Sequence, residues 1–373
     1  MAFQISGSPH RGGIVISVRV SHSFSGFSLN VSFEAPSGVT VLFGRSGSGK
    51  TSVVRAVAGL MRPEHCHVSL AGRVLSDSDR GLWTPPHERR IGYIFQEHRL
   101  FPHLTVKKNL NYGRSFAPPG ARADSLDRVV DMLGIEPLLD RRPSRLSGGE
   151  KQRVAIGRAL LAGPKAILAD EPLAALDEAR KAEILPYFER LRDELAIPIL
   201  YVTHSMAEVA RLATTIVALE NGTVSAFGPA AEVLSDPEFS PAGVRAVGAL
   251  LQTVVRCHHP DALTELDAGG QALFVPQVPQ APGTPLRVRI AAQEVILSLT
   301  PPQGLSALNV IPGRVEHIRR GAGPGAIVSL NTPAGRLLAR ITARSADRLG
   351  LVPGRVCHAI VKSVAIAPED VGG

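Results

Sequence analysis

Cysteine is scarce in this sequence of 373 residues. Its three cysteines, Cys66, Cys257 and Cys357, lie far apart, and none belongs to a C-x-x-C pair. This usage implies neither a disulfide framework nor a zinc site. The cysteine pattern therefore favours a reducing compartment such as the cytosol.

Long apolar runs are also missing. No stretch approaches the roughly 20 apolar residues that a membrane-spanning helix requires, and residues 1–13 lack the apolar core of a signal peptide. We therefore expect a chain without its own membrane span. Aromatic residues make up only 5% of the sequence, but 44% hydrophobic and 20% charged residues are typical of a globular protein. The length predicts two domains.

Negative charge is in the minority, because 41 Lys and Arg residues face 33 Asp and Glu residues and give a formal net charge of +8. Such a charge is compatible with nucleic acid, with anionic lipid head groups, or with solubility alone. Net charge by itself therefore selects no function.

Short apolar runs alternate with helical stretches over the first 235 residues. The candidate strands are residues 39–44, 165–170, 197–204 and 215–228. Asn221-Gly222 is expected to fold the last run into a hairpin, and Pro186 to kink the helical run before residue 197. This alternation predicts an α/β domain with a mainly parallel sheet, and residues 97–163 read as a helical subdomain within it.

The tail has a different character. Beyond residue 240, short strand-like runs are broken by Pro and Gly, which predicts a small all-β barrel or sandwich. We therefore place one domain at residues 1–240 and a second at residues 241–373.

The segment GRSGSGKT at residues 44–51 follows an apolar run and precedes a helical one, which is the context that a phosphate-binding loop needs. Its glycines let successive backbone N–H groups point at phosphate oxygens, and the helix behind it adds its positive dipole end. Lys50 adds a full charge, and Thr51 offers a hydroxyl to Mg²⁺. The loop predicted to bind ATP comprises Gly44, Arg45, Ser46, Gly47, Ser48, Gly49, Lys50 and Thr51.

An acidic pair follows the candidate strand at 165–170. Asp170 is placed to hold Mg²⁺, and Glu171 to orient or deprotonate the water that attacks the γ-phosphate. Taken alone, Asp-Glu after a strand is most often a solvated turn. In one chain with the phosphate loop, the pair predicts an ATPase.

A second glycine-rich segment, LSGGEKQR at residues 146–153, completes a resemblance to the nucleotide-binding subunit of an ABC transporter over residues 14–235. The resemblance implies an α/β P-loop NTPase fold with a RecA-like core and a helical subdomain. It also implies a homodimer in which Ser147, Gly148 and Gly149 cap the ATP held by the partner. A helix beginning near Glu150 suits this role, because helix N-termini bind anions.

Other positions match the family. The resemblance implies that Gln96 contacts Mg²⁺, that His204 contacts the γ-phosphate, and that Asp177 lies at the dimer interface. Phe24 is the aromatic residue chosen to stack on adenine, with His22 and Phe27 as competitors. Two departures from the family pattern are Ala169, where a larger aliphatic residue is usual, and Ala174, where serine is usual.

A single nucleotide domain without a membrane segment implies the arrangement of bacterial importers. The implied partners are separate membrane permease subunits and, indirectly, an external oxyanion-binding protein, with this chain on the cytoplasmic face of the inner membrane. Leu100, Phe101 and Leu104 match the surface that receives the permease, although a role in the core of the helical subdomain stays open.

Residues 300–373 resemble a TOBE or Mop-type domain, and the nucleotide domain resembles the ATPases of molybdate importers. Molybdate is therefore the favoured substrate, with tungstate hard to distinguish. A tetrahedral dianion needs hydroxyls, N–H groups and a cation, and the matching positions are Ser306, Asn309, Lys362 and Ser363. Leu308 replaces a family arginine, so the tail either senses substrate or mainly braces the dimer.

Two alternatives differ from this hypothesis. An importer ATPase for sulfate, sugar, polyamine or iron would share the N-terminal half and a related tail. A soluble nucleic-acid-associated ABC ATPase would explain the charge of +8, but such proteins usually carry a coiled coil or tandem nucleotide domains, and the tail offers few aromatic stacking platforms beyond Phe274. We therefore expect no nucleic-acid partner.

Overall fold

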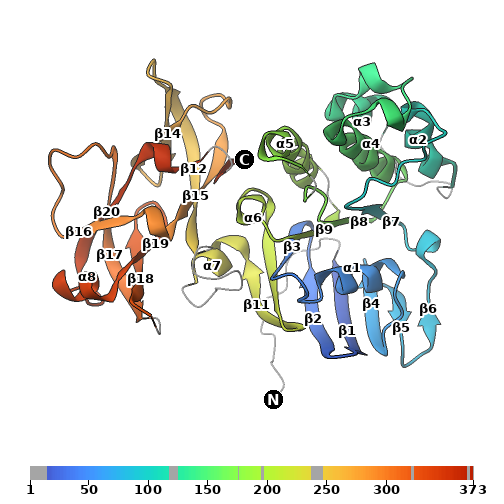
Figure 1. Ribbon diagram of the computed structural model, residues 1–373, viewed down its shortest axis with the longest axis horizontal. Coiled ribbons are helices and arrows are strands. Elements are labelled where there is room, and N and C mark those ends of the chain that lie inside the picture. The colour runs from blue at the N-terminus through green and yellow to red at the C-terminus, as the bar shows by residue number, and fades with distance from the viewer. Residues whose placement is uncertain are drawn as a thin grey trace. The chain divides into compact units, whose positions relative to one another are not determined.

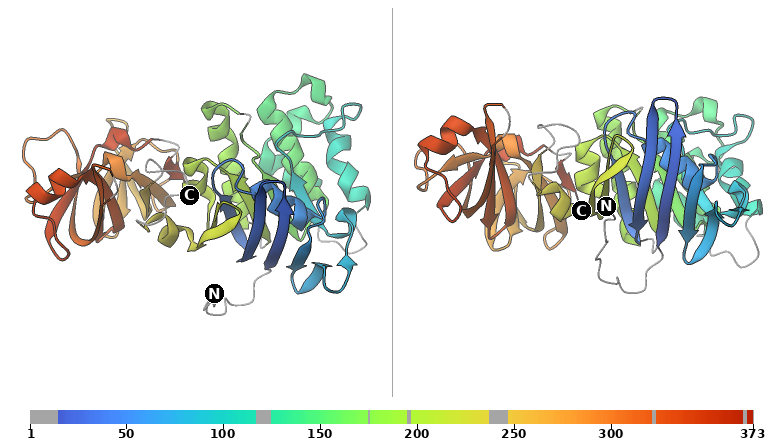
Figure 2. Two further views of the ribbon diagram at one scale, coloured as in Figure 1. Left: turned by 60° about the horizontal axis from the view of Figure 1, so that its bottom comes forward. Right: turned by 90° about the horizontal axis from the view of Figure 1, so that it is seen from below.

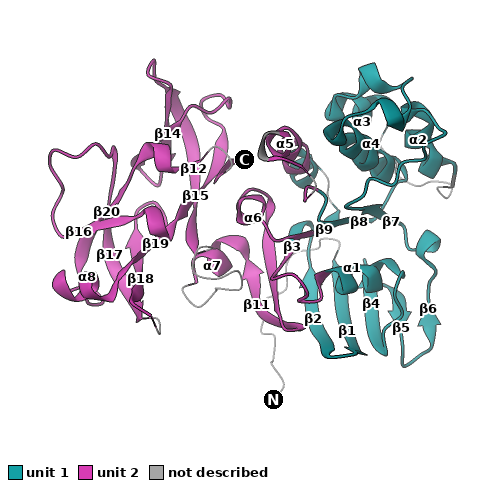
Figure 3. Cartoon of the chain, viewed as in Figure 1, with its two compact units in different colours: residues 1–40, 51–172, 190–201 teal, residues 41–50, 173–189, 202–373 magenta. Residues whose placement is uncertain are grey.

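The computed structural model describes residues 15–116, 125–174, 176–194, 197–236, 247–320, 323–367 and 370–372. Two compact units interleave along the chain (Figure 3). Unit 1 comprises Met1–Thr40, Thr51–Pro172 and Arg190–Tyr201, and unit 2 comprises Val41–Lys50, Leu173–Glu189 and Val202–Gly373. The domain boundary predicted near residue 240 lies outside the described residues.

Unit 1 contains an antiparallel ladder of strands in the order β6-β5-β4-β1-β2 (Figure 1). Figure 2 shows β1 and β2 side by side as long strands. In β2, alternate residues are buried, which is the pattern of a sheet with one covered face. The prediction of a mainly parallel sheet is wrong for this ladder, because each pair of neighbouring strands in it runs antiparallel. Its strands are β1 Ile16–Phe24, β2 Phe27–Ala35, β4 His65–Leu70, β5 Arg73–Asp77 and β6 Leu82–Trp83.

The rest of unit 1 is helical around one parallel strand pair, β7 (Ile91–Ile94) and β8 (Ala166–Asp170). Every residue of β8 is buried up to Ala169, and Asp170 emerges at its end. As the sequence predicts, the described residues between 97 and 163 contain helices and no strand. These helices are α2 Val106–Tyr112, α3 Leu126–Leu133 and α4 Gly148–Leu161, with 3-10 turns η2 Gly113–Phe116, η3 Glu136–Leu138 and η4 Pro143–Arg145.

A buried arginine closes helix α1 (Lys50–Ala58). Arg89 is only 1% exposed, and its guanidinium donates to the backbone oxygens of Ala56 and Val57 at 3.1 and 2.9 Å. It also donates to the Ser76 hydroxyl at 2.7 Å. The last carbonyls of a helix lack partners within the helix, so Arg89 stabilises the C-terminal end of α1.

Unit 2 carries the predicted hairpin, formed by β10 (Thr215–Glu220) and β11 (Thr223–Pro229). Its turn is confirmed, because Asn221 and Gly222 have φ of 47° and 79°, the left-handed values that a two-residue hairpin loop of this kind requires. Pro186 lies inside a helix without ending it. The other elements of this part of the chain are β3 Gly38–Phe43, α5 Glu178–Glu194, β9 Pro198–Thr203, α6 Met206–Leu212 and α7 Ala230–Leu234.

The C-terminal part of unit 2 confirms the all-β prediction with two five-stranded sheets, in the orders β14-β13-β12-β15-β21 and β16-β20-β17-β18-β19. Residues of both sheets, among them Leu266, Val288, Val328 and Leu337, belong to one buried cluster. A single core therefore holds the two sheets together. The elements are β12 Gly248–His258, β13 Leu263–Ala268, β14 Gln271–Pro276, β15 Pro285–Ala291, β16 Ile296–Ser298, β17 Asn309–Arg320, β18 Gly325–Thr332, β19 Gly335–Thr342, α8 Ala343–Arg348, β20 Val356–Val361 and β21 Val371–Gly372.

One ion pair of unit 2 is buried. The Arg211 guanidinium on α6 lies 2.7 Å from the Glu189 carboxylate on α5, and both side chains are less than a tenth exposed, at 8% and 6%. Gly372 of β21 lies directly on this pair, because a Cβ at that position would be 2.4 Å from the Glu189 carboxylate. The last strand thus covers a charged pair, and a larger residue at position 372 would have to displace it.

Candidate functional site

The glycine-rich loop lies between β3 and α1. A Cβ at Gly44 would stand 2.3 Å from the backbone oxygen of Leu219, so no larger residue fits there. Gly47 and Gly49 have φ of 81° and 100°, values that glycine adopts without steric cost. The geometry thus requires glycine at all three positions of the motif.

Lys50 is 5% exposed, and its ammonium donates to the backbone oxygens of Gly44 and Arg45, both at 2.8 Å. Arg45, Ser46 and Gly47 are exposed around it. The buried Ser48 hydroxyl has no hydrogen-bond partner among the described residues. A buried cation and an unsatisfied hydroxyl in a loop that opens a helix fit a phosphate group.

The three residues that the sequence assigns to a metal line one pocket. Thr51, Gln96 and Asp170 border a cavity of about 480 Å³. The Thr51 hydroxyl donates to Asp170 Oδ1 at 3.2 Å, and the Tyr93 hydroxyl donates to Asp170 Oδ2 at 3.1 Å. Hydroxyl, carboxylate and amide oxygens are the ligands that Mg²⁺ prefers, so the residues present fit this ion.

Electrostatics in this pocket centre on Asp170. Burial raises the pKa of Asp170, while the hydrogen bonds from Tyr93 and Thr51 lower it. Burial together with the Asp170 charge raises the pKa of Tyr93, so its phenol keeps the proton that it donates. Burial has the largest of these effects, so the pKa of Asp170 lies above its usual value even though the Arg55 charge also lowers it.

Glu171 follows β8 with a backbone φ of 45°, in the left-handed region that few residues other than glycine occupy. Such backbone strain clusters at functional sites, where the surrounding structure maintains it. Its side chain is half-buried, and its charge contributes to the raised pKa of Asp170. Two carboxylates thus lie next to each other at the end of a buried strand.

Helix α4 begins at Gly148, two residues before the start expected from the sequence. The Ser147 hydroxyl accepts from the Glu150 N–H at 3.2 Å, and the Glu150 carboxylate accepts from the Ser147 N–H at 2.7 Å. This reciprocal cap satisfies two backbone donors at the helix start. Ser147 is exposed and Gly149 is buried, so the serine lies at the surface of the helix tip.

The remaining predicted site residues are exposed. Gln96 and His204 follow β7 and β9, respectively. Asp177 precedes α5 and accepts from the Arg180 N–H at 2.9 Å, so it also caps that helix. Phe24, at the tip of the β1–β2 hairpin, is 37% exposed and makes an edge contact with His22. An exposed aromatic ring is available for stacking, but no described contact connects these residues to one another.

The segment around Leu100, Phe101 and Leu104 is partly exposed, and side chains of neighbouring helices hydrogen-bond its backbone. Arg158 of α4 donates to the backbone oxygen of Arg99 at 2.8 Å, and the buried Asn109 side chain bonds both backbone groups of Phe101. Contact with a permease and packing in the core of the helical subdomain are both compatible with this arrangement, because the three side chains are neither fully buried nor fully exposed.

Tyr93, Arg55 and Arg99 also line the cation pocket, and the sequence did not point to them. Tyr93 lies in β7, where a tyrosine ordinarily indicates packing. Only its pairing with β8 brings the phenol to Asp170, 77 residues away.

The residues predicted to bind oxyanion in the tail are only partly brought together. Asn309 is fully buried, and its amide exchanges hydrogen bonds with the backbone of Phe274 at 2.7 and 2.9 Å and donates to the Ser363 hydroxyl at 3.4 Å. Ser306 and Lys362 are exposed. In this arrangement Asn309 links β14 to β17, so its amide is already occupied.

A second pocket of the C-terminal sheets has a volume of about 1130 Å³ and was not expected. Four arginines line it: Arg319, Arg320, Arg340 and Arg348. None of the four residues predicted to bind oxyanion lines it. This group of four arginines is therefore separate from the residues predicted to bind oxyanion.

In the part of the chain that the structure describes, no helix is both long enough and apolar enough to cross a membrane.

Three features define a P-loop nucleotide-binding protein. They are a strand followed by a glycine-rich loop, a lysine at the start of the next helix, and an aspartate at the end of a buried strand. The model of the ABC transporter family matches residues 28–174, and the TOBE domain model matches residues 305–368.

The molybdenum import ATP-binding protein ModC of Rhizobium etli is 51% identical over 350 residues, which cover 94% of this chain and 98% of that protein. The protein of the same name from Rhizobium meliloti is 52% identical over 342 residues, which cover 91% of this chain and 96% of that protein. A structure of the ATP-binding cassette MJ0796, dimeric and bound to ADP and Pi, matches 58% of this chain and 98% of its own with 26% identity and a TM-score of 0.48. The chain therefore belongs to the family of molybdenum import ATP-binding proteins of ABC transporters.

Proposed function

We propose that this chain binds and hydrolyses ATP to drive the import of molybdate through a separate membrane permease. One structural observation carries the ATPase proposal: Thr51, Gln96 and Asp170, the three residues assigned to Mg²⁺, line one pocket. The substrate rests on relatives named for molybdenum import, which are about half identical over nearly the whole chain.

ATP is held by the loop at residues 44–51 in this proposal. Backbone N–H groups and the Lys50 ammonium bind the phosphates, and the Ser48 hydroxyl gains a partner. The exposed ring of Phe24 stacks on adenine. Thr51, Gln96 and Asp170 hold Mg²⁺, which neutralises phosphate charge when bound.

Hydrolysis depends on Glu171 and His204. Glu171 accepts a proton from the attacking water or orients it, and His204 contacts the γ-phosphate. The strained backbone of Glu171 supports this assignment, because such strain clusters at functional sites. Asp177 lies at the interface with the second protomer.

The active form is a homodimer in which Ser147, Gly148 and Gly149 of one protomer cap the ATP of the other. The N-terminal end of α4 suits this contact through its dipole and close backbone approach at glycine. The dimer docks on the cytoplasmic face of the inner membrane, where Leu100, Phe101 and Leu104 contact the permease. An external oxyanion-binding protein delivers the substrate to that permease.

Ser147→Ala separates the function of this serine from its structural role. The variant is expected to lose about 1 kcal/mol of stability with the cap, and also most ATP-dependent dimerisation, because the partner's phosphate loses a ligand. Dimerisation is measured by size-exclusion chromatography of the Glu171→Gln background with Mg²⁺ and ATP.

Ser125→Ala is the matched control, because Ser125 caps α3 through the Arg128 N–H at 3.2 Å. It should cost similar stability and leave dimerisation intact. Equal dimerisation of the two variants would show that Ser147 only caps its helix.

Tyr93→Phe tests the cation pocket through its pH dependence. The Tyr93 hydrogen bond lowers the pKa of Asp170, so its removal raises that pKa further. Below its pKa the carboxyl is protonated and cannot bind Mg²⁺, so the loss of Mg²⁺-dependent ATP hydrolysis on acidification should begin at higher pH. Mg²⁺ titrations of ATP hydrolysis across a pH series measure the shift.

Tyr112→Phe serves as the control for this series, because Tyr112 is 43% exposed on α2 and does not line the pocket. The Tyr93→Phe and control curves should agree at alkaline pH and diverge several-fold in Mg²⁺ requirement at acid pH. If the Tyr93→Phe and Tyr112→Phe titrations superimpose over the whole pH range, Tyr93 has no role in Mg²⁺ binding.

The substrate is tested on the whole importer, purified from its native membrane through a tag on this chain and reconstituted in vesicles. Molybdate with its binding protein should stimulate ATP hydrolysis and accumulate inside the vesicles. If sulfate, sugar, polyamine or iron stimulates ATP hydrolysis instead, the ATPase proposal stands and the proposed substrate is wrong. Molybdate added on the ATPase side tests the role of the tail. If the tail senses substrate, this molybdate should inhibit ATP hydrolysis. If the tail only braces the dimer, ATP hydrolysis should not change.

A further inference from the structure

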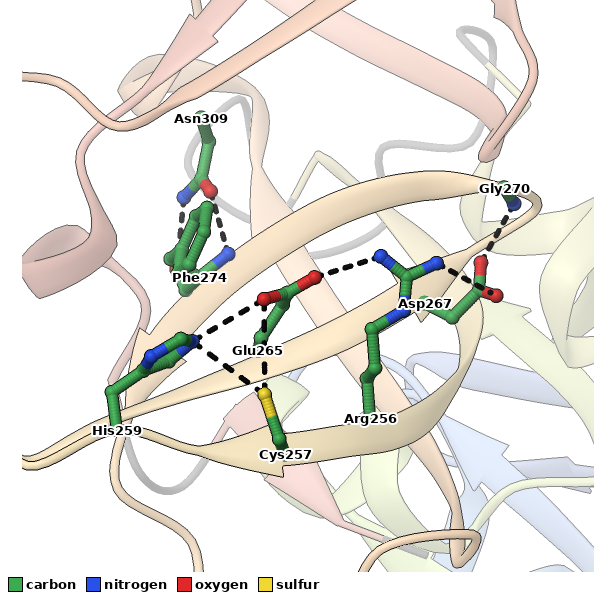
Figure 4. Close-up of polar contacts among 8 residues, drawn as sticks. All are labelled: Arg256, Cys257, His259, Glu265, Asp267, Gly270, Phe274 and Asn309. Atoms are coloured by element: carbon green, nitrogen blue, oxygen red, sulfur yellow. Dashed lines mark hydrogen bonds and ion pairs between the residues drawn. The ribbon is translucent and has the colours of Figure 1, made fainter.

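Three metal-ligating side chains gather on one face of the C-terminal sheets (Figure 4). Cys257 lies near the end of β12, His259 follows two residues later, and Glu265 of β13 is the direct cross-strand partner of Cys257. Residues two apart on an extended chain point to the same side, and cross-strand partners share that side. The register of this strand pair therefore places a thiol, an imidazole and a carboxylate together.

The three ligand atoms are close to one another. Cys257 Sγ lies 3.7 Å from His259 Nε2 and 3.8 Å from Glu265 Oε2, and the imidazole nitrogen lies 3.2 Å from that same oxygen. All three side chains are partly buried. Solvent therefore reaches the cluster, and an ion has a path to it.

These separations match the ligand shell of a tetrahedral ion. Zinc bonds are about 2.3 Å long to sulfur and about 2.1 Å long to nitrogen or oxygen. In a tetrahedral site these lengths place the sulfur about 3.6 Å from a nitrogen or oxygen ligand, and a nitrogen ligand about 3.4 Å from an oxygen ligand. The observed 3.7, 3.8 and 3.2 Å are each within about 0.2 Å of these edges. An ion would fit with almost no rearrangement and keep one open position.

A neighbouring arginine already orients the Glu265 carboxylate. The ladder between β12 and β13 has a bulge between Val255 and Cys257, which brings Arg256 beside Glu265. Arg256 Nη1 donates to Glu265 Oε1 at 2.7 Å, so Oε2 is left for the cysteine and histidine. Such partners fix ligand orientation and tune affinity at protein metal sites.

We propose that Cys257, His259 and Glu265 form a binding site for one divalent transition-metal ion of the zinc class, with the fourth position open to solvent. Thiolate, imidazole and carboxylate are all zinc ligands, and this mixture does not suit Mg²⁺ or Ca²⁺. The site lies outside the nucleotide-binding residues, and its occupancy does not depend on ATP.

Occupancy would tie β12 to β13. The His259 ring also lies 5.7 Å from the ring of Phe274 on β14, and the backbone of Phe274 is held by Asn309 of β17. The ion therefore connects to the contact that joins the two sheets. Because an ion that binds only the folded state stabilises it, zinc should raise the melting temperature of the full chain.

Cobalt titration of the chelator-treated full chain tests the proposal. Co²⁺ bound to a thiolate produces a charge-transfer band in the near ultraviolet, and we expect saturation at one equivalent per chain. Zn²⁺, which binds such ligands more tightly, should abolish the band. Cys66 and Cys357 are buried elsewhere and should not contribute.

Variants identify the ligands. Cys257→Ala should lose the band entirely, and His259→Ala and Glu265→Gln should lose stoichiometric binding. Arg256→Ala should weaken binding by about 10- to 100-fold, the usual effect of removing a side chain that orients a metal ligand. His317→Ala, at an exposed histidine of β17, is the control and should bind like the parent.

No band at stoichiometric cobalt in the parent, or an undiminished band in Cys257→Ala, would overturn the proposal and leave the three side chains as a hydrogen-bonded cluster. Far-ultraviolet circular dichroism of each variant confirms that a lost band reflects lost ligands rather than lost fold. A melting temperature that zinc leaves unchanged in the parent would likewise count against the site.

Discussion

Glu171→Gln is expected to lower ATP turnover by about a hundredfold or more, the usual contribution of a general base, while ATP binding persists. Glutamine has the shape of glutamate but cannot accept a proton from water. Loss of a charge beside Asp170 also removes a contribution that raises the pKa of Asp170, so Mg²⁺ binding should not weaken. Turnover is measured as phosphate release, and binding by equilibrium titration with labelled ATP.

Glu97→Gln is the matched control, because Glu97 is an exposed carboxylate that lines the pocket of Asp170 and has no assigned role. It should retain turnover close to that of the parent. Normal hydrolysis by Glu171→Gln would transfer the role of base to another residue, and equal losses in both variants would indicate a general electrostatic effect.

Arg211→Met is expected to lower the free energy of unfolding by about 3–5 kcal/mol, because it leaves the Glu189 carboxylate buried and unpaired. The double variant Arg211→Met with Glu189→Leu should recover most of this loss, since a buried pair replaced by apolar groups is often close to neutral. Denaturant unfolding followed by circular dichroism measures both.

Arg320→Met is the control for this pair, because Arg320 binds Asp347 with both side chains 57% exposed. Solvent screens that pair, so its removal should change the unfolding midpoint little. A double variant as unstable as Arg211→Met alone would show that the missing side chains matter through packing and not through charge.

Local chemistry made much of the nucleotide site predictable. Asn221-Gly222 predicts a hairpin because its backbone angles are a property of two adjacent residues, and the structure confirms it. Gly47 and Gly49 similarly follow from short-range backbone geometry, whereas Gly44 is required by the backbone oxygen of the distant Leu219. The roles of Ser147, His204 and Asp177 rest on the family resemblance and stay predictions.

Contacts between distant segments could not be predicted in the same way. The antiparallel ladder of unit 1 was missed because alternating residues of β1 and β2 do not reveal which strand they pair with. Asn309 was expected to bind oxyanion, yet its amide bonds the Phe274 backbone, 35 residues earlier in the chain. Sequence separation hides such pairings until the sheets form.

The sequence by itself determined that this chain has a phosphate loop, an acidic strand end and an all-β tail, because each depends on residues that are neighbours along the chain. Only the tertiary structure decided that Tyr93 bonds Asp170 and that Cys257, His259 and Glu265 meet. Strand register makes these contacts, and register is set by the burial of whole sheet faces rather than by any local motif.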